Sequence, residues 1–200
     1  SYVWGGRGME IVYNDDGLKT YVGKAALVSG DHPILIDAFL EDAFEFDVDA
    51  LCDGENVFVA GIMQHIEEAG IHSGDSACVL PAYELTTSAR KKITEYTEKL
   101  ALTLNIIGLI NIQFAMKNGT VYVIEVNPRA SRTVPFISKV IDVPLAKIAA
   151  QLAVGKTLKE LHLESHTNNG LIAIKKPVFP FNKFPQQNVF LSPEMKSTGE

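Results

Sequence analysis

Apolar and polar positions alternate most strictly between residues 45 and 52 of the chain. One side of this segment is apolar and comprises Phe46, Val48, Ala50 and Cys52, and the other is acidic and comprises Glu45, Asp47 and Asp49. Successive side chains of a β-strand point to opposite faces, so the pattern predicts a strand with one buried and one solvated face. Asp53-Gly54 predicts a turn, after which residues 56–62 return as the partner strand.

The rest of the chain predicts helices mixed with strands. Helices are expected over residues 18–27, from an N-cap within 86–88 to residue 104, and from Pro144 to Gly155. Further strands are expected over residues 10–13, 33–39, 109–115 and 120–126, with the last two joined at residues 117–119. Residues 160–200 contain four prolines and no clear period, which predicts an irregular wrap or linker. Strand pairs of the hairpin type favour an α+β fold with a mainly antiparallel sheet and flanking helices.

Composition narrows the class of protein without indicating a function. The 200 residues are 46% hydrophobic and 21% charged, with a net charge of -6, which is ordinary for a globular protein. The acidic balance offers no basic surface for nucleic acid or an anionic membrane, and no run of about 18 apolar residues would span a membrane. The two cysteines lack metal-ligand spacing, so we expect reduced thiols in the core of a cytoplasmic protein. We interpret the start, without Met or signal peptide, as a cut inside a domain.

The segment Glu125-Val126-Asn127 is the strongest candidate for chemistry. Residues two apart on a strand point the same way, so Glu125 and Asn127 can converge on one ion. Gln113 interrupts an apolar strand and offers a third oxygen through its amide carbonyl. Carboxylate and amide oxygens together suit Mg²⁺ or Mn²⁺, and such an ion would bridge nucleotide phosphates. The alternative is that these are ordinary polar residues at a strand end, facing solvent.

The loop between these two strands decides whether Gln113 and Glu125 share a face. A two-residue turn at 118–119 would place Glu125 on the opposite face. A three-residue loop over 117–119, with Gly119 in the left-handed region, would bring both side chains to one face. We therefore predict the three-residue loop, and with a tight two-residue turn the hypothesis of a shared ion would fail.

Other residues could contact phosphate, substrate or ribose. Arg129 and Arg132 follow the candidate metal strand, and guanidinium groups suit phosphate oxygens, although a surface salt-bridge pair would leave the same pattern. The glycine-rich run 5–8 could let backbone N–H groups approach a phosphate, but it is no P-loop, and a flexible turn explains the pattern better. His72 could contact substrate and Glu45 ribose hydroxyls, although both residue types are more often found on an ordinary surface.

Several long motifs in the chain are specific to one family. They include Ser-Tyr-Val-Trp-Gly-Gly-Arg-Gly-Met at 1–9, Ala-Gly-Ile-His-Ser-Gly-Asp-Ser-Ala at 69–77, Asn-Ile-Gln-Phe at 111–114, Glu-Val-Asn-Pro-Arg-Ala-Ser-Arg-Thr-Val-Pro-Phe at 125–136, Val-Pro-Leu-Ala-Lys at 143–147 and Phe-Asn-Lys-Phe-Pro at 181–185. In this order they resemble the large chain of carbamoyl phosphate synthetase, over essentially the whole sequence. The stretches at 73–78 and 132–139 resemble the second of the family's two ATP-grasp halves, which transfers phosphate from ATP to carbamate, whereas the first half activates bicarbonate.

The resemblance implies a fold and a set of site residues. The fold would be the C-terminal part of an ATP-grasp, with a partial lid subdomain at 1–36, a catalytic subdomain at 37–158 and a C-terminal wrap at 159–200. Metal ligands would be Gln113, Glu125 and Asn127, with Asn127, Arg129 and Arg132 in catalysis. Nucleotide contacts would be Ala38 and Leu40 by backbone near the adenine, Glu45 at the ribose, Gly70, Ile71, His72 and Ser73, and a loop with Gly5 and Gly6 closing over the phosphates. At position 38 some members carry a hydrogen-bonding side chain, so Ala38 can take over the backbone contact alone.

The resemblance also implies cofactors and partners. ATP, Mg²⁺ or Mn²⁺ and carbamate would bind, and the parent protein would pair with a glutaminase small subunit in pyrimidine and arginine synthesis. The family's phosphate-binding basic residue lies before the first motif, so we expect the fragment to be inactive by itself. Two alternatives remain, another ATP-grasp ligase of the biotin carboxylase or purine-pathway kind and a non-catalytic nucleotide-binding module. The motifs at 72–76 and 127–132 argue against the first, and an intact set of metal ligands argues against the second.

Overall fold

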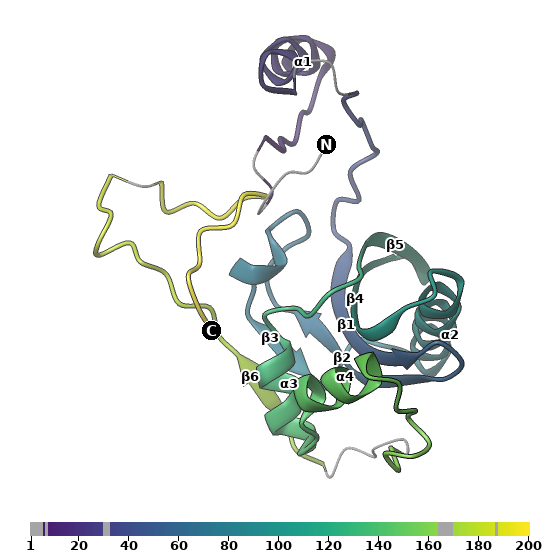
Figure 1. The fold of residues 1–200 in the computed structure, drawn as a ribbon. Coiled ribbons are helices and arrows are strands. Elements are labelled where there is room, and N and C mark those ends of the chain that lie inside the picture. Colours follow the sequence, from purple (N-terminus) through teal and green to yellow (C-terminus); the bar gives the residue numbers. More distant parts are fainter. Residues whose placement is uncertain (1–5, 7, 30–32, 164–169, 187) are drawn as a thin grey trace.

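A six-stranded antiparallel sheet forms the centre of the computed structural model, which describes residues 6, 8–29, 33–163, 170–186 and 188–200 (Figure 1). The strands are β1 (Phe44–Asp53), β2 (Val57–His65), β3 (Cys78–Leu80), β4 (Ile107–Lys117), β5 (Thr120–Asn127) and β6 (Ala173–Lys175). They lie in the order β5-β4-β1-β2-β3-β6, and each neighbouring pair is antiparallel. The helices are α1 (Asp15–Ser29), α2 (Thr87–Thr103), α3 (Val134–Ile141) and α4 (Leu145–Ala153), with a short 3-10 helix η2 (Ser73–Asp75). This architecture confirms the predicted α+β class.

Helices cover both faces of the sheet. The apolar side of β1 packs with α2, and this core includes Phe46, Val48, Ile93 and Phe114. Leu51 on the other side packs with α3 and α4, in a core that includes Met63, Ile137 and Leu152. Both cysteines lie in these cores, as predicted. The cap at Thr86 is also confirmed, since its hydroxyl accepts a hydrogen bond from the Ala89 N–H at 3.2 Å.

The acidic side of β1 differs from the prediction. Glu45, Asp47 and Asp49 retain only 9%, 3% and 1% of their exposure, so the strand is buried on both faces rather than on one. The reason is that polar side chains of β2 and β4 and of the segment after β5 pack against these carboxylates and replace water. Burial without hydrogen bonds would be costly for a carboxylate, and these contacts supply the bonds.

The hairpin between β4 and β5 has a two-residue turn, so the predicted three-residue loop is wrong. Lys117 pairs with Thr120, and Asn118 and Gly119 both have positive φ, at 51° and 75°. An Asn-Gly turn of this kind matches the natural twist of the two strands, which is why it prevails over the longer loop.

A β-bulge further along the same hairpin restores the predicted side-chain face. Phe114 pairs with Val123, but the next pair is Gln113 with Glu125, which leaves Ile124 as the extra residue. One extra residue reverses the alternation of the strand. Glu125 therefore lies opposite Gln113 despite the tight turn, and the argument against a shared ion does not apply.

The N-terminal segment extends away from the sheet, with α1 at its far end (Figure 1). The predicted helix at 18–27 is confirmed and begins three residues earlier, at Asp15. The predicted strands at 10–13 and 33–39 are wrong, because neither segment forms a strand in the described structure. Leu35 and Ile36 are 83% and 61% exposed, since none of the described strands pairs with them. Among the described residues, no helix is both long and apolar enough to cross a membrane.

The C-terminal segment returns along the sheet edge. The irregular character predicted for 160–200 is mostly confirmed, but the short strand β6 was missed. β6 pairs with β3, and Val178 and Gly199 form an isolated bridge beyond it. The last residues therefore lie close to β3 and β6, as Figure 1 shows for the C-terminus.

Candidate functional site

One face of the sheet gathers polar side chains from the neighbouring strands β1, β4 and β5. Cross-strand pairing places Asp47 beside Gln113 and Asp49 beside Asn111. On the next strand, Gln113 lies beside Glu125 and Asn111 beside Asn127. Because paired residues point to the same face, the predicted ligands of β4 and β5 and the acidic side of β1 form one continuous polar surface. The sequence could have indicated Asn111, which interrupts the same apolar strand as Gln113, two residues earlier.

Between the residues that the structure describes, hydrogen bonds at the three predicted metal ligands engage the amide oxygen of Asn127 but not Gln113 Oε1 or Glu125 Oε2. The Gln113 amide nitrogen donates to Glu45 Oε2 at 3.2 Å, so its carbonyl oxygen is not used in that bond. The Asn127 amide nitrogen donates to Glu125 Oε1 at 2.8 Å, and Arg129 donates to Asn127 Oδ1 at 3.2 Å. In the part of the chain that the structure describes, no group of three His, Cys, Asp or Glu side chains is arranged to hold a metal. A cation here would therefore need ligand oxygens from a bound phosphate in addition to one carboxylate and two amides.

The predicted ribose and adenine contacts lie together at one end of this face. The Gly70 N–H donates to Glu45 Oε1 at 3.2 Å. Gly70 has a φ of +91°, and a Cβ there would lie 2.8 Å from the Phe39 ring, so glycine is required on two counts. Ala38 is exposed and Leu40 half-buried on either side of that ring. The structure thus brings the 38–40 segment, Glu45 and Gly70 together, as a nucleotide site would require.

A buried histidine, which the sequence analysis missed, supports the ribose candidate. His65 Nε2 lies 2.9 Å from Asp47 Oδ2, and Nδ1 lies 3.3 Å from Glu45 Oε2. Burial by itself lowers the His65 pKa, but the hydrogen bond to Asp47 and the negative charges of Asp47 and Glu45 raise it to about 9. The imidazolium thereby balances two buried carboxylates. Extending the predicted strand from residue 62 to 65 would have placed this side chain on the polar face.

Asp49 is the deepest carboxylate of the polar face. Its Oδ1 accepts from the Ser131 hydroxyl at 2.7 Å and from the Asn111 amide at 3.1 Å, and its Oδ2 accepts from the Thr133 hydroxyl at 2.5 Å. Burial raises the pKa of Asp49 to about 6, although the bonds from Thr133 and Ser131 oppose that rise. The two hydroxyl oxygens lie 2.6 Å apart. Asp49, Ser131 and Thr133 thus make three oxygen–oxygen contacts, and the two hydroxyl groups supply only two protons. All three contacts can be hydrogen bonds only when Asp49 carries a proton as well.

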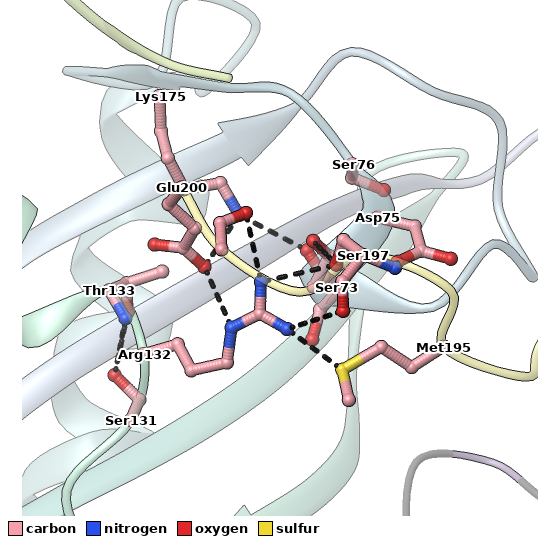
Figure 2. Close-up of polar contacts among 12 residues, drawn as sticks. Ser73, Asp75, Ser76, Ser131, Arg132, Thr133, Lys175, Met195, Ser197 and Glu200 are labelled. Carbon is pink, nitrogen blue, oxygen red and sulfur yellow. Dashed lines mark hydrogen bonds and ion pairs between the residues drawn. The ribbon is translucent and has the colours of Figure 1, made fainter. Parts of the chain in front are cut away.

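Arg132 points toward the C-terminal segment, as Figure 2 shows. Its guanidinium donates to the Ser197 hydroxyl at 3.1 Å and the Gly199 carbonyl at 3.2 Å, and Nε lies 3.5 Å from Glu200 Oε1. The neighbouring Arg129 is exposed and contacts Asn127 instead. The two arginines are therefore not equivalent, and a phosphate contact by Arg132 would require it to exchange its present partners.

The loop at 72–75 is held by the same C-terminal segment. His72 Nδ1 accepts from the Gly74 N–H at 3.0 Å, and the His72 N–H donates to the Ser192 carbonyl at 3.0 Å. Burial lowers the pKa of His72, which favours its neutral form. The carbonyl of Ser73 accepts from the Lys175 ammonium at 3.2 Å (Figure 2). The predicted nucleotide contacts Ile71, His72 and Ser73 are all half-buried.

Asp75 fastens this loop to the C-terminal segment and was also missed. It is fully buried, and its carboxylate accepts the N–H groups of Lys196 at 2.8 Å and of Ser197 at 2.7 Å. These partners lie more than a hundred residues away along the chain, so no local pattern indicates them. Gly6 packs against Pro193 of the same segment, whereas Gly5 lies outside the described residues.

Known proteins resemble the chain along its whole length. A family model described as carbamoyl-phosphate synthase L chain, ATP binding domain, matches residues 1–161. The chain is 60% identical to the carbamoyl phosphate synthase large chain of Archaeoglobus fulgidus and 56% identical to that of Vibrio cholerae. Each alignment covers 100% of this chain but 19% of the relative. The chain thus spans about a fifth of the length of the curated relatives it matches.

Solved structures share the fold at low sequence identity. Biotin carboxylase from Campylobacter jejuni, solved as a β,γ-ATP complex, is 20% identical, with a TM-score of 0.72 over 88% of this chain and 40% of its own. The biotin carboxylase domain of Hydrogenobacter thermophilus 2-oxoglutarate carboxylase, solved with MgADP and bicarbonate, is 21% identical, with a TM-score of 0.71 over 88% and 39%. The likeness confirms the ATP-grasp fold that the motifs predicted.

Proposed function

Because the chain belongs to the ATP-binding domain family of carbamoyl phosphate synthase large chains, we propose that its polar face binds ATP and serves phosphoryl transfer to carbamate. The observation that carries the proposal is the convergence of Glu45, Gln113, Glu125 and Asn127 on one face, beside Gly70. Relatives named carbamoyl phosphate synthase reach 60% identity, against 20–21% for the biotin carboxylases, which favours carbamate over biotin chemistry.

We propose Mg²⁺ or Mn²⁺ as the cofactor, held by Gln113, Glu125 and Asn127. The donor set fits a hard cation, because it consists of oxygen atoms alone and includes one carboxylate. It carries too little charge to hold a cation tightly unless phosphate oxygens complete the coordination. When bound, the ion would supply positive charge beside the β- and γ-phosphates.

The nucleotide would lie along the polar face from the ribose end to the metal end. Glu45 offers carboxylate oxygens to the ribose hydroxyls, and His65 and Gly70 hold that carboxylate in place. Backbone groups of Ala38 and Leu40 would contact the adenine, and the loop 70–73 the sugar and phosphates. Gly5 and Gly6 would belong to the covering loop.

Phosphoryl transfer would proceed without a covalent protein intermediate. An oxygen of carbamate attacks the γ-phosphorus, the bond to the β–γ bridging oxygen breaks, and ADP leaves with that electron pair, so the products are carbamoyl phosphate and ADP. Arg129 is exposed beside Asn127 and would neutralise charge on the transferred group. Asn127 Oδ1 has two lone pairs, so it would accept from Arg129 and also bind the ion. Arg132 would join them only after releasing the C-terminal segment.

The larger protein provides the context of the proposal. We propose that residues 1–36 are part of a lid, 37–158 the catalytic subdomain and 159–200 a wrap that leads to other parts of the protein. A glutaminase small subunit would supply ammonia for the carbamate, in a cytoplasmic route to pyrimidines and arginine.

The reverse reaction tests this proposal in the longer protein that contains this sequence. ATP formation from ADP and carbamoyl phosphate should fall by about a hundredfold or more in Glu125→Gln, because an oxygen ligand with charge is lost at the transferred group. Glu95→Gln is the matched control, since Glu95 is 57% exposed on α2, across the sheet from the site. Equal activity of Glu125→Gln and the control would contradict the proposal.

A further inference from the structure

The segment between β5 and α3 has little backbone support of its own. Residues 128–133 carry Arg129 and Arg132 and follow Asn127 directly. Within the segment, the Arg129 N–H donates to the Asn127 carbonyl at 2.8 Å, and the Ser131 carbonyl accepts a long bond from the Val134 N–H at 3.5 Å. The Thr133 carbonyl accepts from the Ile137 N–H at 2.9 Å, which is already the first turn of α3. The position of this segment therefore depends on its side-chain contacts.

The start of α3 shows where those contacts go. Thr133 occupies the N-cap position, yet its side chain makes no capping bond and its φ is -80° with ψ at -13°, in the helical region. A threonine at this position usually caps the helix with its hydroxyl. Here the hydroxyl donates to Asp49 Oδ2 instead, and the Ser131 hydroxyl accepts from the Thr133 N–H at 3.2 Å.

Asp49 also reaches the strand that pairs with Asn127. The Asn111 amide donates to Asp49 Oδ1 at 3.1 Å, and Asn111 lies opposite Asn127 in the β4–β5 ladder. The same oxygen accepts from Ser131 at 2.7 Å. One carboxyl group thus links β4, the neighbour of the strand before the segment, to the helix start after it.

Stability alone gives a poor account of an acid at this position. Asp49 is 1% exposed, and Leu51, two residues along the same face, packs in the apolar core under α3. The groups that donate to Asp49 are uncharged, and a buried carboxyl without a cation costs free energy of folding. Apolar residues in place of Asp49 and its partners together could fill this space at lower cost, but they would not hold the segment that carries Ser131 and Thr133.

We propose that Asp49 is a positioning residue, which fixes the segment 128–133 through Ser131 and Thr133 so that Asn127 and Arg129 face a metal-bound phosphate. The inference rests on the proposed function of the face. Asn127 is partly exposed and Arg129 is exposed, and they contact mainly each other and Glu125. The position of their backbone must therefore be fixed by the buried contacts of the neighbouring residues.

Three variants of the 200-residue chain test the inference. Asp49→Asn removes one acceptor oxygen, Thr133→Val removes one hydroxyl at constant shape, and Thr133→Ser keeps the hydroxyl and is the matched control. Two quantities are measured for each: the ratio of ADP affinities with and without Mg²⁺, and amide hydrogen exchange over residues 129–134. We expect Asp49→Asn and Thr133→Val to lower the Mg²⁺ ratio by about tenfold and to speed exchange locally, while metal-free affinity stays within about twofold.

The outcomes separate this inference from the proposed function. If Asp49→Asn and Thr133→Val both keep the wild-type ratio of ADP affinities with and without Mg²⁺, the inference is overturned and the proposed function stands. The inference is also overturned if this ratio falls as much in Thr133→Ser as in Thr133→Val, because loss of the hydroxyl would then not be the cause of the fall. Without any Mg²⁺ effect in the wild type the proposed function fails. In that case only the hold of Asp49 on the segment 128–133 can stand. It stands if exchange over 129–134 rises in Asp49→Asn and Thr133→Val, and falls if it does not.

Discussion

At the residue scale, the site is a set of buried charges that balance one another. His65 stands between Glu45 and Asp47, and the proximity of this imidazolium and of Lys175 lowers the pKa of Asp47 even though its burial raises it. Asp49 has no such partner among the groups that contact it, and burial raises its pKa to about 6. Two carboxyl groups two residues apart on one strand are thus expected to differ in charge near pH 5.

The shared histidine predicts a particular dependence of stability on pH. The His65 pKa is about 9 in the folded chain against an ordinary value of 6.5. Because the folded chain binds this proton more tightly, protonation of His65 stabilises the fold. This contribution to the free energy of unfolding is complete below pH 6.5 and is lost as the pH rises through 9. Its size is on the order of 3 kcal/mol.

Denaturant unfolding of the wild type and His65→Gln between pH 6 and 10 measures this contribution. The wild type should exceed the variant most at pH 6, and the difference should shrink by pH 10. Titrations of groups far from His65 are common to both chains and cancel in the difference. A difference that stays constant with pH would show that His65 does not carry this proton.

At the element scale, the hairpin shows how far local pattern leads. Alternation in β1 and the turns after β1 and β4 correctly predicted two antiparallel hairpins, β1 with β2 and β4 with β5. The pairing of β1 with β4, which joins the hairpins, was not predicted. The local pattern failed for 33–39, where the apolar residues find no strand to pair with in the described structure. The prediction that Gln113 and Glu125 share a face was correct, but the three-residue loop given as its reason was wrong. The bulge at Ile124, which is the actual reason, has no signal in the sequence.

Two exposed glycines, one in the tight turn and one in a helix, should respond differently to substitution by alanine. Gly119 has a φ of +75° and open space around it, so Gly119→Ala should lose about 1 kcal/mol of unfolding free energy from backbone strain alone. Gly23 lies within α1, also in open space. Gly23→Ala should be neutral or stabilise by about 0.5 kcal/mol, because alanine favours a helix.

Urea unfolding midpoints of the two variants provide the check. A Gly119→Ala chain as stable as the wild type would mean that the turn relaxes to negative φ, and the two-residue connection would then be in doubt. Gly23→Ala controls for the general effect of adding a methyl group to an exposed glycine.

At the scale of the whole molecule, the C-terminal segment completes the loop that the site uses. Asp75, Arg132 and Lys175 all contact residues 195–200, as Figure 2 shows. Sequence reasoning predicted the loop 69–76 and the arginine but assigned neither of them to this segment. Contacts between residues so far apart in the chain depend on the complete sheet, which local periodicity does not specify.

The C-terminal contacts predict a large effect of one conservative substitution. Asp75→Asn should cost about 2 kcal/mol of unfolding free energy, because the buried carboxylate accepts the backbone N–H groups of Lys196 and Ser197. Asp37→Asn is the control, since Asp37 is exposed in the extended segment before β1, and it should change stability by less than about 0.5 kcal/mol.

Thermal or denaturant unfolding compares the two asparagine variants. Faster hydrogen exchange over residues 192–200 in Asp75→Asn alone would locate the loss in the C-terminal segment. If Asp75→Asn and Asp37→Asn proved equally stable, the segment would be held by other contacts than this carboxylate.

The central claim is that the polar face is a metal–nucleotide site, and calorimetric titration of ADP into the 200-residue chain tests it most directly. The titration is made with Mg²⁺ and with chelator, on the wild type, Glu125→Gln and the control Glu95→Gln. The account predicts that Mg²⁺ strengthens binding by about tenfold in the wild type and the control, and that Glu125→Gln loses this gain. A gain that Glu125→Gln keeps in full, or no gain in the wild type, would contradict it.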